Sequence, residues 1–322
     1  MKANVLQLLR DEEGNYISGA KISEALNCSR TMVWKYIDAL RKEGYEIEAV
    51  SNKGYCLIKE YDRLSKHELL SRLTDHSIFS DVIYEESTPS TQIIAQAAAN
   101  EGVCEGTVVI ADEQVSGRGR LGREWYSPPE TGIWMSMILR PKVDFRRAPQ
   151  LTLVTAVAVV RAIEHVTKLE AEIKWPNDLL LNGKKIAGIL TEMQADPDQI
   201  KAVIIGVGIN VNHRSFPEGI EDIATSLANE SDRTFNRAEL IAQILKEFEW
   251  LYDAYLTKGF SFIKPLWEAR SNTIGRMIKA RTANDVIEGF AEGIDEEGVL
   301  LLRDKTGDRH NIYSADIDIA KN

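Results

Sequence analysis

The chain contains the run Gly117-Arg118-Gly119-Arg120-Leu121-Gly122-Arg123-Glu124-Trp125, in which three glycines are interleaved with three arginines. Glycine lets the backbone approach a ligand closely, and arginine presents a planar fork of donors that suits carboxylate and phosphate oxygens. Because this arginine loop (residues 117–125) has almost no apolar surface to bury, we expect it to be mobile alone and ordered by an anion. It is not a P-loop, since no Gly-Lys-Ser/Thr follows, and its glycine spacing differs from the dinucleotide-binding fingerprint. A solvated basic loop without a ligand is the alternative.

The composition indicates a soluble, globular chain of two or three domains. The 322 residues are 44% hydrophobic and 27% charged, and no apolar run approaches the length of a membrane span. Residues 1–13 lack the apolar core of a signal peptide, and Cys28, Cys56 and Cys104 have no metal-ligand spacing. We therefore expect a cytoplasmic protein with reduced thiols, no zinc site and no membrane contact.

The net charge of −10 is unevenly distributed along the chain. Residues 1–60 contain nine Lys/Arg and nine Asp/Glu, so the remaining residues carry the whole deficit. An acidic body argues against broad nucleic-acid binding, but a small neutral module can bind DNA through one locally basic helix.

Residues 1–60 are predicted to form a winged helix-turn-helix. Two short amphipathic helices are followed by a third over about residues 30–42, which begins after the cap Ser29. Residues 46–58 have the pattern of a β-hairpin wing. The third helix would be the recognition helix, and we assign its DNA contacts to Ser29, Arg30, Thr31 and Lys35. A three-helix cap with no DNA role is the alternative.

Residues 61–270 are predicted to form a central α/β domain with a mixed sheet. Strands are expected near 82–85, 107–111, 132–139 and 202–211, and long helices near 92–100, 148–166 and 237–256. Ser90-Thr91-Gln92 lies at a strand-to-helix turn, where hydroxyl and amide groups can bind a polar ligand, although Ser90 also suits the N-cap of the helix. Residues 213–224 are polar and irregular, which predicts a second mobile loop.

A second polar motif, Lys174-Trp175-Pro176-Asn177-Asp178, precedes a predicted hairpin. Proline cannot donate a ladder hydrogen bond and so marks a strand end or edge, after which Asn177 and Asp178 suit a sugar, a phosphate or Mg²⁺. Asn182-Gly183 is the favoured type I′ turn pair, and strand alternation places Lys184 and Lys185 on opposite faces. One of the two lysines can therefore point into a site, and Gly188 leaves room there for a ligand.

Residues 271–322 are predicted to form a small SH3-like β-barrel. Its short strands are expected at 276–282, 286–293, 298–303 and 310–319, with turn signals between them. The predicted fold is thus an α+β multidomain chain with an N-terminal winged helix-turn-helix, a central α/β domain and a C-terminal barrel.

These motifs, in this order, closely resemble those of the biotin protein ligases. The resemblance rests on Ser90-Thr91-Gln92, the arginine loop, Lys174-Trp175-Pro176-Asn177-Asp178, Lys185-Ile186-Ala187-Gly188 and Gly206-Val207-Gly208-Ile209-Asn210. With the winged helix in front, the chain looks like the bifunctional form of the family, which is both a biotin–carboxylase ligase and a biotin-operon repressor. The resemblance covers all three segments of the chain.

The resemblance implies an enzyme that activates biotin with Mg²⁺ and ATP to biotinyl-5′-AMP, releasing pyrophosphate. Biotin then passes to one lysine of the biotin carboxyl carrier protein of acetyl-CoA carboxylase. Biotinyl-5′-AMP would also act as corepressor, by favouring a homodimer that presents two winged helices to a two-fold operator DNA.

The site residues of the family are carried over here by motif match. Lys185, Arg118 and Arg120 would be catalytic. Biotin would contact Ser90, Thr91, Gln92, Gln114, Arg118, Gly119, Arg120, Lys185 and Gly188. The nucleotide would contact Arg120, Arg123, Trp125, Lys174, Asn177 and Asn210, with adenine near residues 213–224, and Asp178 would bind Mg²⁺.

The charges of these residues agree with that reaction. Attack of a carboxylate on an α-phosphate brings two anions together, so catalysis must be mainly charge neutralisation and positioning. Arg118, Arg120, Lys185 and Mg²⁺ supply positive charge there, and a loop folded over the acyl-adenylate shields it from water. No cysteine or serine is paired with a base in the sequence, so we expect no covalent enzyme intermediate.

Three other functions stay open from the sequence alone. They are a lipoate-type acyl-adenylate ligase, a ligand-sensing transcription factor without turnover, and a winged-helix adaptor. The arginine loop and the winged helix argue against the first, and the intact Lys185 and arginines argue against the second.

Overall fold

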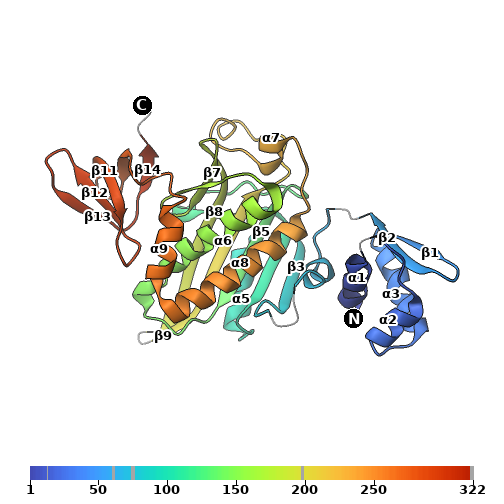
Figure 1. Ribbon diagram of the computed structural model, residues 1–322. Helices are drawn as coiled ribbons and strands as arrows, with labels where there is room; N and C mark the ends of the chain where they lie inside the picture. The colour runs from blue at the N-terminus through green and yellow to red at the C-terminus, as the bar shows by residue number, and fades with distance from the viewer. Residues whose placement is uncertain (13, 60–61, 74–76, 197–198, 320–322) are drawn as a thin grey trace.

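The computed structural model describes residues 1–12, 14–59, 62–73, 77–196 and 199–319. The chain forms three parts in a row: a helical N-terminal part, a central sheet covered by helices, and a small C-terminal sheet at the opposite end (Figure 1). The predicted boundary at residues 60 and 61 lies outside the described residues. The second predicted boundary, at residues 270 and 271, lies between the last central helix and the first strand of the C-terminal sheet.

The N-terminal part is the predicted winged helix-turn-helix. Its elements are α1 (Lys2–Asp11), α2 (Gly19–Ala25), α3 (Arg30–Lys42) and the antiparallel pair β1 (Glu46–Val50) and β2 (Gly54–Lys59). The side chains of Ser18 and Ser29 cap α2 and α3 by accepting hydrogen bonds from the backbone N–H groups of Lys21 and Met32. The apolar stripes of the three helices meet in one small core, which includes Val5, Leu6, Leu9, Ile22, Val33, Ile37 and Leu40.

The central part is a seven-stranded mixed sheet. Its strands are β3 (Asp81–Thr88), β4 (Thr107–Gln114), β5 (Gly132–Leu139), β6 (Glu172–Lys174), β7 (Asp178–Leu181), β8 (Lys184–Asp196) and β9 (Gln199–Asn210), in the spatial order β3-β4-β5-β9-β8-β7-β6. Only the β3–β4 pair is parallel, because α5 (Thr91–Asn100) joins these two strands in a βαβ unit, and the other neighbours are antiparallel.

Helices cover the two faces of this sheet unequally. The long helices α6 (Gln150–Thr167) and α8 (Arg237–Lys258) and the shorter α9 (Phe260–Glu268) pack over one face, and their side chains form the main core (Figure 1). On the other face α5 covers only Val109, Ile138, Ala202 and Ile204. The rest of that face is therefore free of helices and is where the site described below lies.

One helical segment among the described residues, Phe145–Thr167, is long and apolar enough to cross a membrane. Most of its apolar window is buried inside the protein, where α6 packs on the sheet. It is the core helix expected from the sequence.

The C-terminal part is a five-stranded antiparallel sheet. Its strands are β10 (Met277–Arg281), β11 (Val286–Ile294), β12 (Leu300–Asp304), β13 (Arg309–Ile312) and β14 (Asp316–Ile319), in the order β13-β12-β11-β10-β14. The prediction of one strand over 310–319 was wrong. The chain bends at Tyr313 and Ser314 and crosses from one edge of the sheet to the other, so that β13 pairs with β12 and β14 pairs with β10.

Two short α-helices remain among the described residues, α4 (Lys66–Leu70) and α7 (Leu227–Ser231), besides the 3₁₀ segments Arg120–Gly122 and Phe145–Arg147. The sequence predicted a helix around residues 67–73, where α4 lies, but neither α7 nor α9. Helix α7 has five residues, too few for a helical period to show, and α9 carries Pro265 inside it, a residue that normally signals the end of a helix.

Candidate functional site

The helix-free face of the central sheet forms the floor of a cavity of about 1400 Å³. Strand alternation places Ser136 of β5, Gly188 of β8 and Gly206 and Gly208 of β9 on this face. Gly188 and Gly208 lie opposite each other in the β8–β9 ladder. A Cβ at Gly208 would lie 2.5 Å from the indole nitrogen of Trp125, so the indole needs the glycine beneath it.

A hydrogen-bonded polar wall closes the cavity at the N-terminus of α5. The amide oxygen of Gln114 accepts a hydrogen bond from the backbone N–H of Thr91 at 2.9 Å, and the Thr91 hydroxyl lies 2.9 Å from that of Ser136. Ser136 in turn donates to the amide oxygen of Gln92, whose Nε2 donates to the Ile204 carbonyl. Each side chain is therefore held in one orientation, as specific recognition of a polar ligand requires.

Ser90 is the N-cap residue of α5 by position but makes no side-chain cap hydrogen bond. Its side chain is buried at the cavity, next to Thr91. The reading of Ser90 as a helix cap alone is therefore not supported by its contacts.

The arginine loop is a short hydrogen-bonded hairpin that forms one side of the cavity. The backbone N–H of Gly119 donates to the Arg123 carbonyl, and that of Trp125 donates to the Gly117 carbonyl. Arg118 and Glu124 are thereby paired as in an antiparallel β-bridge. Leu121 at its tip is 76% exposed and has a positive φ of 57°. The loop thus has a defined path of its own, and its ordering by an anion stays a prediction.

Two arginines of the loop contact the C-terminal part. Arg120 donates to the amide oxygen of Asn177 at 3.0 Å and to the hydroxyl of Ser314 at 2.7 Å. Arg123 forms a two-pronged ion pair with Asp316. Burial lowers the pKa of Arg120, while the hydrogen bond to Asp316 raises the pKa of Arg123 and lowers that of the carboxyl. Both guanidinium groups stay charged, because an arginine pKa is far above neutral.

Lys185 points into the cavity, and Lys184 is exposed, as strand alternation predicts. The ammonium of Lys185 lies 2.7 Å from a carboxylate oxygen of Asp178 and 5.1 Å from the centre of the Trp125 ring. A lysine, an aspartate and an indole therefore meet at the centre of the floor, beside Gly188.

The loop 213–224 also lines the cavity. Phe216, Ile220, Asp222 and Ile223 line it, and the backbone N–H of Lys185 donates to the Ile223 carbonyl at 2.7 Å. The loop is irregular, as predicted, and it is fastened directly to the strand that carries Lys185.

Asn177 and Asn210 are both buried and hold the backbone at the two ends of the floor. Asn177 Nδ2 donates to the Ile189 carbonyl at 2.8 Å, and Asn210 Nδ2 donates to the Thr225 carbonyl at 3.1 Å. The side-chain oxygen of Asn177, Oδ1, also accepts a hydrogen bond from Arg120. Strand β6 ends at Lys174, and Pro176 lies in the turn between β6 and β7, which agrees with the strand end predicted from the sequence.

All residues assigned from the sequence to biotin, nucleotide or Mg²⁺ line this one cavity: Ser90, Thr91, Gln92, Gln114, Arg118, Gly119, Arg120, Arg123, Trp125, Lys174, Asn177, Asp178, Lys185, Gly188 and Asn210. The individual roles given to them stay predictions. Four further residues at the site were not predicted from the sequence: Ser136, Phe216, Ser314 and Asp316. Ser136 had a signal, because it is the one hydroxyl in the otherwise apolar strand β5.

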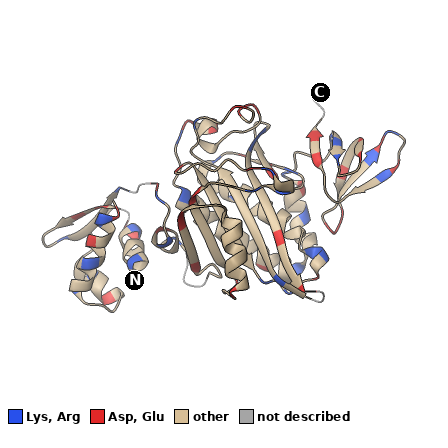
Figure 2. Ribbon diagram, turned by 180° about the vertical axis from the view of Figure 1, so that it is seen from behind, with Lys and Arg blue, Asp and Glu red and all other residues tan. Residues whose placement is uncertain are grey.

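The residues assigned to DNA lie apart from this cavity. Ser29, Arg30, Thr31 and Lys35 are all exposed, at the N-terminal half of α3. Both basic and acidic residues lie on the helices of this part (Figure 2). Trp34, 55% exposed on the same helix, was not singled out.

Family models cover all three parts of the chain. Residues 2–56 match an HTH domain, residues 84–210 match the Biotin/lipoate A/B protein ligase family, and residues 273–319 match the Biotin protein ligase C terminal domain.

Named relatives match nearly the whole chain. The Bifunctional ligase/repressor BirA of Bacillus spizizenii is 50% identical over 99% of this chain and 98% of its own length. The protein of the same name from Escherichia coli is 29% identical over 90% of this chain. The biotin protein ligase from Aquifex aeolicus, solved in complex with biotin and ATP, superposes with a TM-score of 0.67 at 32% identity, covering 76% of this chain and 100% of that one. The chain therefore belongs to the biotin protein ligase family, with the arrangement of its bifunctional ligase/repressor members.

Proposed function

We propose that this protein activates biotin with ATP to biotinyl-5′-AMP and transfers the biotin to a lysine of the biotin carboxyl carrier protein of acetyl-CoA carboxylase. We propose further that its winged helix represses transcription when biotinyl-5′-AMP is bound. One observation carries the proposal: the same cavity is lined by the basic side chains of Arg118, Arg120 and Lys185 and by a neutral, hydrogen-bonded polar wall. A substrate with a carboxylate at one end and a neutral polar ring at the other fits such a cavity.

The first step forms a bond between a biotin carboxylate oxygen and the α-phosphorus of ATP, and breaks the bond to pyrophosphate. Two anions must meet, and negative charge grows on the phosphoryl oxygens. Lys185 and Arg120 would neutralise that charge, and Arg118 would close over it. Lys185 is held at the floor by Asp178 and Trp125, so its ammonium is already positioned before the substrates react.

The neutral end of biotin would lie against Thr91, Gln92 and Gln114. These side chains have a fixed hydrogen-bond pattern, so the wall can recognise a ring with both donors and acceptors. Gly188, next to Lys185 and Trp125, would leave room for the reacting end.

The nucleotide would bind across Trp125, Arg123, Lys174, Asn177 and Asn210, with adenine toward the loop 213–224. Among the described residues no group of three or more His, Cys, Asp or Glu side chains could hold a metal ion alone. Magnesium commonly uses one or two protein carboxylates and takes its other ligands from phosphates and water. Asp178 fits that role, and the ion would supply further positive charge at the phosphates.

In the second step the amine of the carrier lysine attacks the acyl carbon of biotinyl-5′-AMP, forming an amide and releasing AMP. The reaction needs no nucleophile from this protein. Both activities need molecules that are available in the cytoplasm, namely biotin, ATP, the carrier protein and DNA. We therefore place both activities there.

The activity test uses pure protein with biotin, Mg²⁺ and ATP labelled at the α-phosphate. We expect labelled biotinyl-5′-AMP, and biotinylation of an added carrier domain. Lys185→Ala should lower the rate by about 10²-fold or more. Lys201→Ala is the matched control, because Lys201 pairs with Asp196 at the same 2.7 Å at the far end of the β8–β9 hairpin. Wild-type turnover by Lys185→Ala would refute the role of Lys185.

Two further arms separate the alternative functions. Lipoate in place of biotin should give no adenylate, and adenylation of lipoate in preference to biotin would show a lipoate-type ligase. Binding of biotin without any adenylate would show a sensor rather than an enzyme.

Repression would act through a homodimer that biotinyl-5′-AMP favours. Sedimentation and DNA-binding titrations, with and without biotin and ATP, test this directly. We expect the adenylate to tighten both the dimer and the binding of operator DNA. An adenylate that alters neither would refute the corepressor role.

A further inference from the structure

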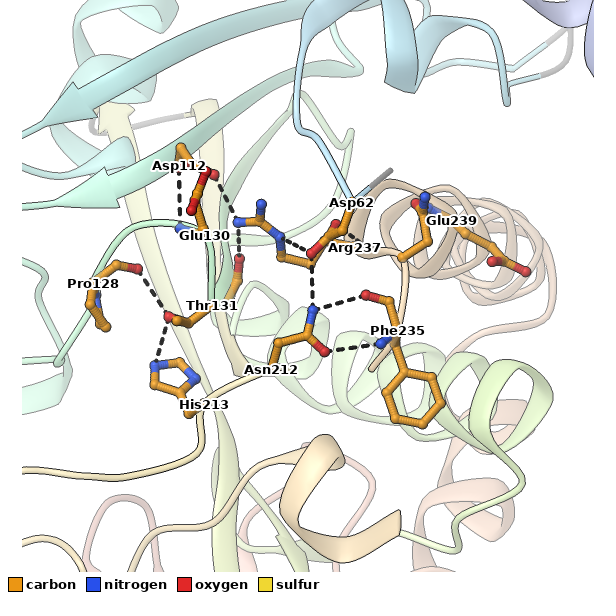
Figure 3. A network of polar contacts seen from close by, with 12 residues as sticks. Asp62, Asp112, Pro128, Glu130, Thr131, Asn212, His213, Phe235, Arg237 and Glu239 are labelled. Carbon is orange, nitrogen blue, oxygen red and sulfur yellow. Dashed lines mark hydrogen bonds and ion pairs between the residues drawn. The ribbon is translucent and has the colours of Figure 1, made fainter. Parts of the chain in front are cut away.

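Two adjacent residues after the wing contact different parts of the protein: Asp62 contacts the central part, and Arg63 contacts the N-terminal part. The carboxylate of Asp62 accepts hydrogen bonds from Arg237 and Asn212 of the central part (Figure 3). The guanidinium of Arg63 donates to the backbone carbonyl of Glu43, the C-cap residue of α3. The end of the DNA-contacting helix is thus joined to the central part by one dipeptide, Asp62-Arg63.

Arg237 lies at the centre of the contacts on the Asp62 side. Its side chain is only 1% exposed and lies between two carboxylates, with Nε 2.8 Å from Asp62 and Nη1 2.8 Å from Asp112. The same Nη1 donates to the carbonyl of Gly132 at 3.3 Å. A buried guanidinium needs its partners, because an unpaired buried charge is strongly unfavourable.

The residues that this network contacts lie within or next to strands that line the cavity. Asp112 lies two residues before Gln114 on β4, and Gly132 is the first residue of β5. Asn212, which donates to Asp62 at 2.9 Å, lies two residues after Asn210. The Asp62–Arg237 network therefore contacts three segments that run into the ligand site. The contact with Asn212 leads to Asn210, on the proposed nucleotide side.

A path also leads from this network into the loop 213–224. The backbone N–H of Asn212 donates to the Thr131 carbonyl at 2.6 Å, and the Thr131 hydroxyl lies 3.1 Å from Nε2 of His213 (Figure 3). The His213 ring stacks on Phe216, which lines the cavity, with 5.2 Å between ring centres. Movement of this loop at the ligand therefore reaches the partners of Asp62 through direct contacts.

A second contact holds the N-terminal part against α4. Glu68 of α4 is 2% exposed and accepts hydrogen bonds from Arg10 of α1 and from the Tyr45 hydroxyl. Because the N-terminal part also contacts α4, we expect a displacement at Asp62-Arg63 to turn α3 rather than merely to free the N-terminal part.

We propose that Asp62 is a positioning residue for both activities: it holds the nucleotide side of the ligand site in place and, through Arg63, sets the orientation of α3. DNA affinity and adenylate affinity are then coupled within one protomer, in addition to any coupling through the dimer. The coupling is reciprocal, as it must be between two equilibrium binding events. This inference rests on the proposed ligase and repressor function.

Asp62→Asn is the test variant. It keeps the shape of the side chain but places an amide N–H₂ where one oxygen now accepts from both Arg237 Nε and Asn212 Nδ2. We expect the KM for ATP to rise about tenfold while kcat stays within twofold, because the site is displaced and its chemistry is intact. Asp81→Asn is the matched control, since Asp81 forms an exposed ion pair with Lys66 just beyond this segment.

Arg63→Ala separates the two ends of the connection. Arg63 is exposed and contacts the winged helix, so this variant should fold and keep the wild-type KM for ATP. The DNA probe is a duplex that the wild-type protein selects from a random-sequence pool in the presence of biotin and ATP. We expect the increase in DNA affinity caused by biotin and ATP to shrink by about fivefold or more in Arg63→Ala, with an unchanged dimer dissociation constant.

The outcomes are distinguishable. The inference is overturned if biotin and ATP increase DNA affinity as much in both variants as in the wild type. It is also overturned if the increase is smaller only because the variants dimerise more weakly. Absence of biotinyl-5′-AMP with the wild-type protein would instead overturn the proposed function. Should Asp62→Asn fail to fold, Asp62→Glu keeps the charge and must show a smaller KM change in the same direction.

Discussion

At the scale of the residue, His213 shows how burial sets the charge state beside the ligand site. The ring is 2% exposed, stacked on Phe216 and hydrogen-bonded through Nε2 to Thr131. Burial, helped by the positive charge of Arg237, lowers the pKa of His213 to about 4. The imidazole is therefore neutral at physiological pH and serves as an aromatic surface rather than as a cation.

This pKa predicts a specific loss of stability in mild acid. The pKa of His213 is lowered in the folded state, so between about pH 6.5 and 4 the unfolded state binds more protons and stability falls as the pH falls. The slope from this one group is at most about 1.4 kcal/mol per pH unit. Urea unfolding of the wild type and of His213→Asn at pH 7.5 and 5 measures it. The wild type should lose more stability than the variant, and equal losses would contradict the neutral histidine.

At the scale of the element, the arginine loop is a hairpin with a strained tip. Leu121 adopts a left-handed backbone at φ 57°, which costs a non-glycine residue about 1 kcal/mol. Its exposed side chain contributes little in return. The backbone hydrogen bonds of the hairpin, rather than the leucine side chain, therefore hold the loop at the side of the cavity.

Leu121→Pro should therefore release the intermediate. Proline fixes φ near −65° and cannot follow the present path, so the loop should open and biotinyl-5′-AMP should escape about tenfold faster or more. Leu121→Gly, which accepts the positive φ, should retain the intermediate as the wild type does. Labelled adenylate that passes a spin filter in single-turnover reactions provides the measurement. Equal retention by both variants would show that the loop does not seal the site.

The elements also show what the sequence could predict. Helix α3 matches its predicted range. The N-cap Ser29, the regular spacing of apolar residues and Gly44 just after the helix all indicate the same bounds. Strand alternation predicted that one of Lys184 and Lys185 faces the site, and the motif match named Lys185, which lines the cavity. Helix α9 was missed because its internal proline opposes its apolar stripe, and β13 and β14 were merged because the switch of partner strands leaves no local pattern.

At the scale of the whole molecule, the ligand site is completed by a part of the chain that the motifs do not include. Ser314 and Asp316 of the C-terminal sheet contact Arg120 and Arg123. Such pairs join residues more than 190 positions apart, as in Arg120–Ser314 with a separation of 194. No periodicity or local spacing can indicate them, so the site prediction lacked both residues.

Asp316→Ala should change nucleotide binding far more than stability. The pair with Arg123 is largely exposed, and pairs of that kind contribute about 1 kcal/mol or less to folding. Removing a carboxylate that lines the cavity and occupies Arg123 should lower the KM for ATP by several-fold, since the phosphates no longer compete with it. Steady-state kinetics and a thermal melt test both statements. A KM that rises would mean that Asp316 positions Arg123 for the nucleotide instead.

The long separation between Arg120 and Ser314 also bears on how the protein is made. Domains fold largely in the order in which they leave the ribosome, so the winged helix and the strands that carry the arginine loop appear first. The arginine loop then emerges 194 residues before the hydroxyl that Arg120 will contact. A nascent chain can thus display its winged helix while the arginines of its ligand site still lack their last partners, and the ligand site is assembled late in synthesis.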